Sequence, residues 1–552
     1  MTDTGSTTTK TFTGTETTDS EDEPLVADRW SHNITYRQLV LTSCVGILQL
    51  WWHPYIHDLT KIIPFVFIYN VFSCFVCYPM FYQELAIGIV TRKSVLKCWD
   101  LAPAARGIGF SLLICCVFTA FASSVVSAYC LALFVHSFHT FLPWLHCAAA
   151  AKPPCSARHR PLTVGSETPA QSFFLNYVLK LKRNEFEGGF GSLVKELMVY
   201  FLISWFLIYL VSIKRIYSYS KMVLFKDILA FFVIICCSFG ASRLKGASAM
   251  FDKADWSALA DPKLWRIALE YSLIEMTLSQ GSLIMIGSYC PKEKQRLSLT
   301  VLFAFMVAKG TGLCTTLILG ATHGALSHDY NNDTNLINNS AASMILWADY
   351  VARVPGSQFW SALVFFTLFV VAITSTALLV QTIMSAFTGK SMRNLRAAIL
   401  FSLCILFGLI GTFLLCSQGG VYTVELPTHS RHSVTVSQSS RCVVGRRVHG
   451  GGGDVVGGVP LARAGRGGDG RGRHLHVRAG PLLRGRVLRR GGVPARAGAR
   501  VLGLDTARYY CNFHVRIVSG DRHRACHPRV EFGRVDAGAI PAYIAVLYDV
   551  QM

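Results

Sequence analysis

The sequence predicts an all-α polytopic membrane protein, and two observations lead to this fold class. First, 52% of the 552 residues are hydrophobic and the mean hydropathy is +0.39, which is too apolar for an ordinary soluble protein. Second, apolar stretches of about 20 residues, long enough to cross a bilayer, recur along the chain. Because lipid offers no partners to backbone N–H and C=O groups, such stretches must be helices rather than isolated strands.

Nine apolar segments meet this length criterion. In chain order they lie near residues 38–57, 62–88, 109–137, 195–213, 221–241, 266–289, 297–322, 358–387 and 395–416. The first contains GILQLWWHPY (46–55), in which a Gln and a Pro interrupt the apolar run. A proline kink without function would explain this interruption, and so would an unwound stretch whose backbone lines a polar cavity.

The segments outside the helices predict the topology. Residues 1–29 are Thr-rich and carry the acidic run DSEDE, which is typical of a disordered tail rather than of a signal peptide. The loop after the second segment is basic, and short basic loops stay in the cytoplasm. Its cations are Arg92, Lys93, Lys97 and Arg106. We therefore expect a cytoplasmic amino terminus and a multi-pass protein of the plasma membrane.

The next loop then faces the oxidising exterior, where Cys147 and Cys155 would form a disulfide. Most of the 18 cysteines lie inside apolar segments instead, where Cys behaves as a small hydrophobe. The sequons at Asn332 and Asn338 also fall on the outside, so we expect these asparagines to be glycosylation acceptors.

Short motifs spread over residues 28 to about 425 resemble, in the same order, those of the neurotransmitter:sodium symporter family. They are DRWS (28–31), YPMFYQELAIG (78–88) with PAARGIGF (103–110), LPW..C (142–147), TPAQSFFLNYVLK (168–180), LADPKLW (259–265), GSLIMIGSY (281–289), VPGSQFW (354–360) and QGGVY (418–422). The resemblance implies a transporter core over 30–425 with an inverted repeat of five plus five helices. In that fold the first and sixth helices are broken at the bilayer midplane, and the Gln and Pro of the first segment then mark its unwound part.

The resemblance also implies a solute site at the broken helices, built from Gly46, Ser123, Gln280 and Gly281. Gly46 aligns with a position that is aspartate in relatives that carry monoamines and glycine in those that carry amino acids. An aspartate would repel a carboxylate on the solute, whereas glycine leaves room for one. We therefore expect an amino-acid-like or neurotransmitter-like small molecule.

The second sodium site implied by the resemblance keeps its oxygen donors. Backbone carbonyls of the first segment and hydroxyls of the eighth supply them, at Thr42, Val45, Ala372, Ser375 and Thr376. Oxygen ligands suit a hard cation, so we expect this site to be intact and sodium to be the coupled ion. The alternative is that the Ser-Thr pair only bonds back to its own helix.

The first sodium site and the chloride site are degenerate by the same comparison. The sodium positions are Cys44, Gln49, Glu275 and Ala304, and the chloride positions are Glu275 and Ala308. Glu275 replaces a hydroxyl and would supply a negative charge itself, so we expect chloride-independent transport with Glu275 as a counter-charge or a proton-titrating group. Lys309 lies about 100° around the helix from Ala308, so we expect it to face another helix or a water pocket rather than Glu275.

The gate positions have changed as well. Trp52 stands where the family has the arginine of the outer gate, and an indole cannot form the bidentate pair that arginine makes with a carboxylate. The outer lid must therefore close by packing or not close at all. Lys390 reverses the charge of the inner-gate acid, whereas Glu84 and Tyr55 are as the family has them.

Residues 426–536 have a different composition, with 21 Arg, six acidic residues and no Lys between Pro427 and Asp536. A basic nucleic-acid-binding tail is one interpretation, but aromatic-Gly repeats are missing. We favour a shifted reading frame, because VRAGPLLRGRVLRR (477–490), read one base downstream, permits YGLDRFCGDVFYVA, which resembles the family's tenth helix. The carboxy-terminal helices are then disrupted, residues 426–536 are disordered as written, and 537–552 are a remnant of the last helix.

Two functions follow from these observations. The first is sodium-coupled symport of an amino-acid-like or neurotransmitter-like solute, which Gly46 and the second sodium site favour. The second is a non-transporting relative or an inactive truncated product, which Ala304, Trp52, Lys390 and the missing tenth helix favour. We do not expect an enzyme, since no nucleophile–base pair, phosphate loop or zinc spacing stands out. The expected partners are the solute and membrane lipid, without nucleic acid, and the oligomeric state stays open.

Overall fold

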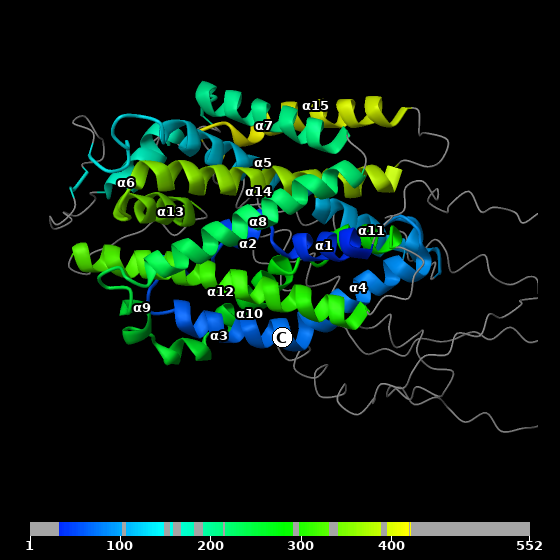
Figure 1. The fold of residues 1–552 in the computed structure, drawn as a ribbon, viewed down its shortest axis with the longest axis horizontal. Helices are drawn as coiled ribbons and strands as arrows, with labels where there is room; N and C mark the ends of the chain where they lie inside the picture. Colours follow the sequence, from blue (N-terminus) through cyan, green and yellow to red (C-terminus); the bar gives the residue numbers. More distant parts are fainter. Residues whose placement is uncertain are drawn as a thin grey trace, which may run out of the picture. The chain divides into compact units, whose positions relative to one another are not determined.

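The computed structural model describes residues 33–101, 106–147, 155–157, 167–181, 191–213, 216–290, 297–330, 341–387, 395–418 and 420. Within these ranges the chain is almost entirely helical, as predicted, and the helices pack against one another in a bundle (Figure 1). The predictions on residues 1–29, Asn332, Asn338, Lys390 and 426–552 lie outside the described residues.

Seven helices in the described part of the chain are long and apolar enough to cross a membrane. They are Ile62–Thr91, Arg106–His136 (α5), Lys195–Ile213 (α7), Tyr219–Ala241 (within α8, Ile216–Ala241), Leu297–Asp329 (α12), Ser357–Phe387 (α14) and Arg396–Leu415 (α15). Each corresponds to one predicted segment. The main difference is α12, which continues to Asp329 instead of ending at 322.

The first and sixth predicted segments are each broken into two helices. The first consists of α1 (Asn33–Cys44) and α2 (Ile47–Trp51), and the sixth of α10 (Pro262–Glu275) and α11 (Ser282–Ser288). α10 begins at Pro262, whose fixed φ suits a first helical position, directly after the capping carboxylate of Asp261. Helices are thus present at all nine predicted segments, and the two breaks lie in the helices expected of an inverted-repeat transporter.

The break in the first segment lies upstream of where the sequence placed it. α1 ends at Cys44 and α2 begins after Gly46, so Gln49 is inside a helix and Pro54 lies beyond the end of α2. Gln49 is tolerated in α2 because its side-chain amide finds partners on α12. Pro54 is tolerated because a missing N–H has little cost after a helix has ended.

The span Ile62–Thr91 contains a turn of unusual geometry. It is made of α3 (Ile62–Phe72), the π-helical turn η2 (Ser73–Cys77) and α4 (Tyr78–Thr91). π-helical turns are rare and often lie at functional sites. Here η2 turns the side chain of Ser73 into the interior, where it is fully buried.

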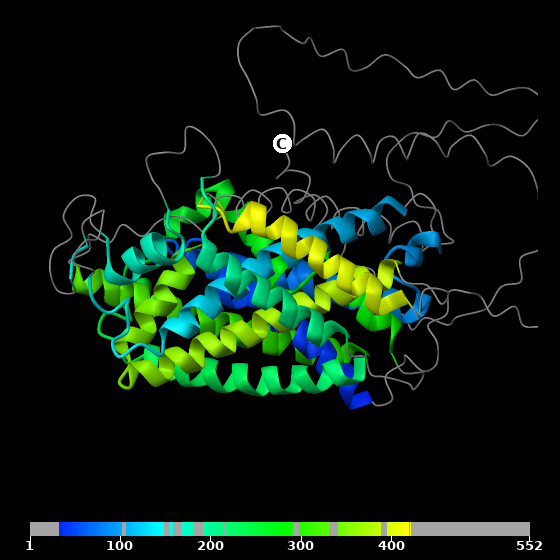
Figure 2. The same ribbon diagram turned by 90° about the horizontal axis from the view of Figure 1, so that it is seen from above.

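The long helices form two groups (Figure 1). In one group α10 packs on α3, α11 packs on α4, and both α1 and α4 pack on α12. In the other group α14 packs on α5 and α7, and α15 packs on α7. α8 contacts α1, α12 and α14, so it joins the two groups, and it runs along one edge in the second view (Figure 2). α2 and α11, which are halves of the two broken helices, also contact α14, so the breaks face the second group.

α8 has one apolar face and one inward face with charges. Its outward aromatic and aliphatic side chains are 53–65% exposed, as expected of a face that meets lipid. They are Phe225, Ile228, Phe232, Ile235 and Phe239. Lys226 and Asp227 point the other way and are buried. The fold thus brings a lysine and an aspartate into the protein interior.

Shorter elements fill the connections. They are η3 (Lys97–Leu101), α6 (Pro169–Ser172), η5 (Phe173–Val178), α9 (Ala249–Asp252), η7 (Trp256–Ala260) and α13 (Ala342–Arg353). The predicted disulfide Cys147–Cys155 is present, with its Cα atoms 5.6 Å apart. The Arg353 guanidinium lies 2.7 Å from Asp329 and 2.6 Å from Asp349, and so ties the ends of α12 and α13 together.

Candidate functional site

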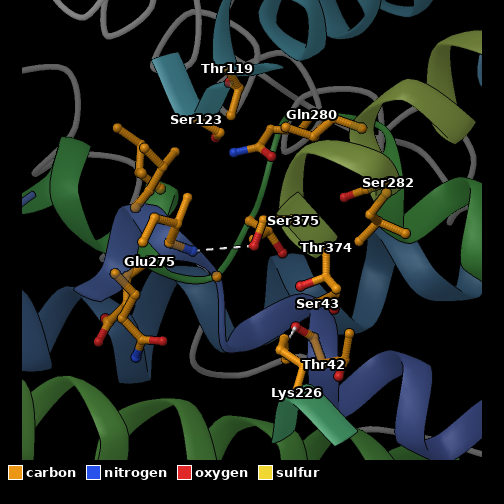
Figure 3. A pocket seen from close by; sticks show the side chains of 18 of the residues that line it. Thr42, Ser43, Thr119, Ser123, Lys226, Glu275, Gln280, Ser282, Thr374 and Ser375 are labelled. Atoms are coloured by element: carbon orange, nitrogen blue, oxygen red, sulfur yellow. Dashed lines mark hydrogen bonds between the residues drawn. The ribbon is translucent and has the colours of Figure 1, made fainter. Parts of the chain in front are cut away.

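A small polar cavity lies between the two helix breaks. Its polar lining includes Thr42, Ser43, Thr119, Ser123, Lys226, Glu275, Gln280, Ser282, Thr374 and Ser375. These residues come from α1, α5, α8, α10, α11 and its preceding break, and α14. Figure 3 shows Thr119, Ser123 and Gln280 at one end of the cavity and Thr42 with Lys226 at the other.

Three of the four predicted solute residues, Gly46, Ser123 and Gln280, line this cavity. The backbone of Gly46 (φ −101°, ψ 163°) is one that any residue adopts, and a Cβ there would meet only Ser375 Oγ, at 3.7 Å. The backbone conformation therefore does not require glycine at this position, and the missing side chain leaves space in the cavity. Gly281 is not in the lining; its φ of +74° forms the turn into α11.

The break between α10 and α11 is held by Glu84 of α4. Thr277 and Ser279 adopt left-handed backbone angles of 51° and 60° in φ. The N–H of Ser279 donates to Glu84 Oε1 at 2.8 Å, and Glu84 is buried. The carboxylate thus satisfies a backbone donor that the break takes out of the helical pattern.

At the predicted first sodium position, two side chains donate to helix carbonyls and a third has no polar atom. Gln49 Nε2 donates to the carbonyl of Ala308 at 2.6 Å and to Thr311 Oγ1 at 3.0 Å, so the side chain binds α12. Ala304 is buried and has no side-chain oxygen. The Cys44 thiol donates to Val40 O at 3.6 Å within its own helix.

Glu275 and Lys309 form a buried ion pair, so the expectation that Lys309 faces elsewhere was wrong. Lys309 Nζ donates to Glu275 Oε2 and, at 2.7 Å, to Ser73 Oγ. It also lies 4.8 Å from the centroid of the Tyr69 ring. The prediction placed Lys309 only by its angle around the helix from Ala308. Gly312 lacks a side chain, so Glu275 packs against the α12 backbone there, and Lys309, three residues away on the same face, reaches it.

Sequence reasoning missed Lys226 and Asp227 on α8. Lys226 Nζ donates to Val45 O at 2.9 Å and Thr42 O at 3.4 Å, and it lies 2.8 Å from Asp227 Oδ1. Thr42 Oγ1 in turn donates to Asp227 Oδ2. Two charges inside the predicted span 221–241 were the available signal, because charged residues within membrane helices are functional by default. Their place near the start of the span made them resemble a helix end.

The second sodium position therefore differs from the expectation of an intact site. Its two carbonyl donors, on Thr42 and Val45, accept hydrogen bonds from Lys226. Thr376 Oγ1 donates to Ala372 O at 2.8 Å in its own helix, which was the alternative interpretation. Ser375 Oγ accepts from the N–H of Ile47 at 3.2 Å and so ties α14 to the start of α2 (Figure 3).

The outer-gate position has aromatic neighbours. The Trp52 ring lies 5.8 Å, centroid to centroid, from that of Tyr271, and Trp52 packs on a buried cluster that includes Phe65 and Tyr69. Trp52 thus packs on aromatic side chains at the position where the family has its gate arginine. Burial lowers the pKa of the nearby His57 imidazole, so this side chain adds no charge at neutral pH.

Two broken helices around a buried polar cavity, inside a bundle of membrane-spanning helices, define a secondary transporter of the inverted-repeat class. The chain belongs to the sodium:neurotransmitter symporter family, whose sequence model matches residues 27–444. It is accordingly a transporter and not an enzyme.

Curated relatives agree with this assignment. The chain is 23% identical over 454 residues to the sodium- and chloride-dependent neutral and basic amino acid transporter B(0+) of Mus musculus. The aligned region covers 74% of this chain and 70% of that protein. It is 24% identical to the sodium- and chloride-dependent GABA transporter ine of Drosophila melanogaster, over 75% of this chain and 45% of that one. It is 24% identical to the sodium-dependent nutrient amino acid transporter 1 of Drosophila pseudoobscura pseudoobscura, over 72% of this chain and 65% of that one.

A solved structure has the same fold. The crystal structure of MhsT in complex with L-phenylalanine superposes with a TM-score of 0.56 at 15% sequence identity and covers 75% of this chain and 93% of MhsT. The family and the relatives together indicate a sodium-dependent solute symporter. At the second sodium position, however, the residues of this chain do not fit a sodium ion, because Lys226 already binds the carbonyls of Thr42 and Val45.

Proposed function

We propose that this chain is a secondary active transporter that carries an amino-acid-like solute across the plasma membrane by alternating access. The solute occupies the cavity between the two helix breaks. The observation that carries this proposal is Gly46, which lies in the cavity wall where only Ser375 Oγ is near an added Cβ. A carboxylate on the solute has room there, and no acidic side chain at that position repels it.

The remaining lining suits a small zwitterion. Ser123, Ser282 and Gln280 are buried and offer hydroxyl and amide donors, which are the groups that orient a carboxylate in an enclosed site. Apolar side chains from α10 and α14, Ile274 and Leu378, complete the wall. Apolar side chains beside polar groups that fix orientation are typical of small-molecule sites.

Transport by this chain does not depend on chloride in our proposal. Glu275 supplies the negative charge at the chloride position, and the Lys309 ammonium neutralises it. The Glu275 carboxylate would repel a halide at this position, and Ala308 offers no hydroxyl to bind one. Glu275 thus acts as a fixed counter-charge.

A second candidate is a relative that binds its solute without transporting it. The buried contacts that tie α12 to α10 and α8 to α1 favour this candidate. Alternating access must keep or exchange such contacts, because a buried charge that loses its partner is costly.

Uptake of labelled amino acids separates the two candidates. The full chain is produced in cells that lack amino-acid uptake of their own, and surface labelling verifies that it reaches the plasma membrane. We expect uptake that unlabelled amino acids compete and that the corresponding amines do not. No uptake of any amino acid by surface-exposed protein would favour the binding protein and overturn the transporter.

A further inference from the structure

The Lys226 ammonium occupies an oxygen-lined position at the end of α1. Its Nζ donates to Val45 O and Thr42 O, at 2.9 and 3.4 Å, and forms an ion pair with Asp227 Oδ1 at 2.8 Å. A lysine ammonium donates and cannot accept, so an oxygen-lined position suits it. The side chain is 1% exposed, so water does not compete.

These oxygens include the two carbonyls that the family comparison assigns to the second sodium ion. Thr42 lies in the last turn of α1 and Val45 lies in the break, so both carbonyls are at the negative end of the helix dipole. Such a position suits a monovalent positive charge coordinated by oxygen. Sodium meets this requirement as a free ion, and a lysine ammonium meets it as a tethered one.

Asp227 completes the arrangement. Its Oδ2 accepts from Thr42 Oγ1, and its Oδ1 lies against Lys226, so one carboxylate joins the lysine to α1. The pair has no net charge, as a buried pair in a membrane must. A sodium ion beside the ammonium would face a like charge at close range and carbonyls that are already engaged.

We propose that Lys226 is a tethered cation that replaces the second sodium ion, so that solute binding and transport by this chain need no sodium. Only the statement about transport without sodium rests on the proposed transport function. At the first position Lys309 already pairs with Glu275 Oε2. The chain thus departs from the sodium dependence that its family implies.

A lysine that only caps the end of α1 would show the same hydrogen bonds. The two roles differ in what happens when the side chain is removed. A cap leaves a destabilised helix end that no particular ion repairs. A cation substitute leaves an oxygen cage, with Asp227 beside it, that sodium can fill.

The test measures thermal unfolding of the purified full chain in sodium chloride and in choline chloride at equal ionic strength. We expect the wild type to unfold at the same temperature in both salts. We expect Lys226→Ala to unfold at a lower temperature in choline, and sodium to raise its midpoint by several degrees, since an ion that binds only the folded state stabilises it. Lys221 is an exposed lysine on the same helix, so Lys221→Ala is the matched control and should unfold at the same temperature in both salts.

Two results overturn the proposal. One is a wild type that sodium stabilises, and the other is a Lys226→Ala variant that unfolds early and that sodium does not rescue. If Lys226→Ala does not fold, the wild-type comparison still decides, and Lys226→Arg, which keeps the charge, should remain insensitive to sodium.

Uptake in the same two salts separates this inference from the proposed function. Unchanged wild-type uptake in choline supports both. Uptake that disappears in choline supports transport and overturns the tethered cation. No uptake in either salt, together with sodium rescue of Lys226→Ala in the unfolding assay, overturns transport and leaves the role of Lys226 standing.

Discussion

At the scale of single residues, the buried pair of Glu275 and Lys309 gives the sharpest prediction on stability. Lys309→Met removes one partner and leaves Glu275 unpaired among buried groups, so we expect a loss of about 3–5 kcal/mol in the free energy of unfolding. Glu275→Gln combined with Lys309→Met removes both charges and should recover much of that loss. Chemical unfolding of the purified variants measures both values. A double variant no more stable than Lys309→Met would contradict the ion pair.

Glu275 should also determine whether uptake depends on chloride. Wild-type uptake should not change when gluconate replaces chloride, because the Glu275 carboxylate supplies the negative charge. Glu275→Ser restores the hydroxyl of the family and removes that charge, so its uptake should rise with chloride concentration. Glu275→Gln, which is uncharged and not a hydroxyl, is the control. If Glu275→Ser stayed indifferent to chloride, the counter-charge role would be lost.

At the scale of elements, Glu84 supports the break between α10 and α11. Glu84→Ala leaves the N–H of Ser279 without its acceptor, and we expect a loss of about 1–3 kcal/mol in stability. It should also weaken solute binding, because Gln280 follows directly in the chain. Glu84→Gln keeps an acceptor oxygen and should cost much less. Equal losses in the two variants, measured by thermal unfolding, would speak against this hydrogen bond.

How much the sequence reveals also differs between elements. Hydropathy located all nine segments, because burial in lipid demands long apolar helices whatever their neighbours are. It did not locate the first break, since Gln49 stays helical only through its partners on α12. Nor did it reveal the partners of Lys226 and Lys309. Those contacts depend on the packing of α8 on α1 and on the approach of Glu275, at the end of α10, to α12, which local sequence does not encode.

At the scale of the whole molecule, the matches to the family and the composition of the tail lead to a prediction about the coding sequence. The match to the family model ends at residue 444, and the Arg-rich region extends to 536. We expect the transcript across the codons for 420–540 to differ by one base from the sequence translated here and to restore YGLDRF. Confirmation of the Arg-rich tail would contradict the frameshift and predict a chain that does not transport.

The most direct measurement is equilibrium binding of a labelled amino acid to the purified full chain, with its decarboxylated amine as competitor. We predict that the wild type and Gly46→Ala bind the amino acid and that the amine does not compete. Gly46→Asp should bind at least about tenfold more weakly, which is about 1.4 kcal/mol, because its carboxylate repels that of the solute. Undiminished binding by Gly46→Asp, or equal competition by the amine, would contradict a carboxylate site at Gly46.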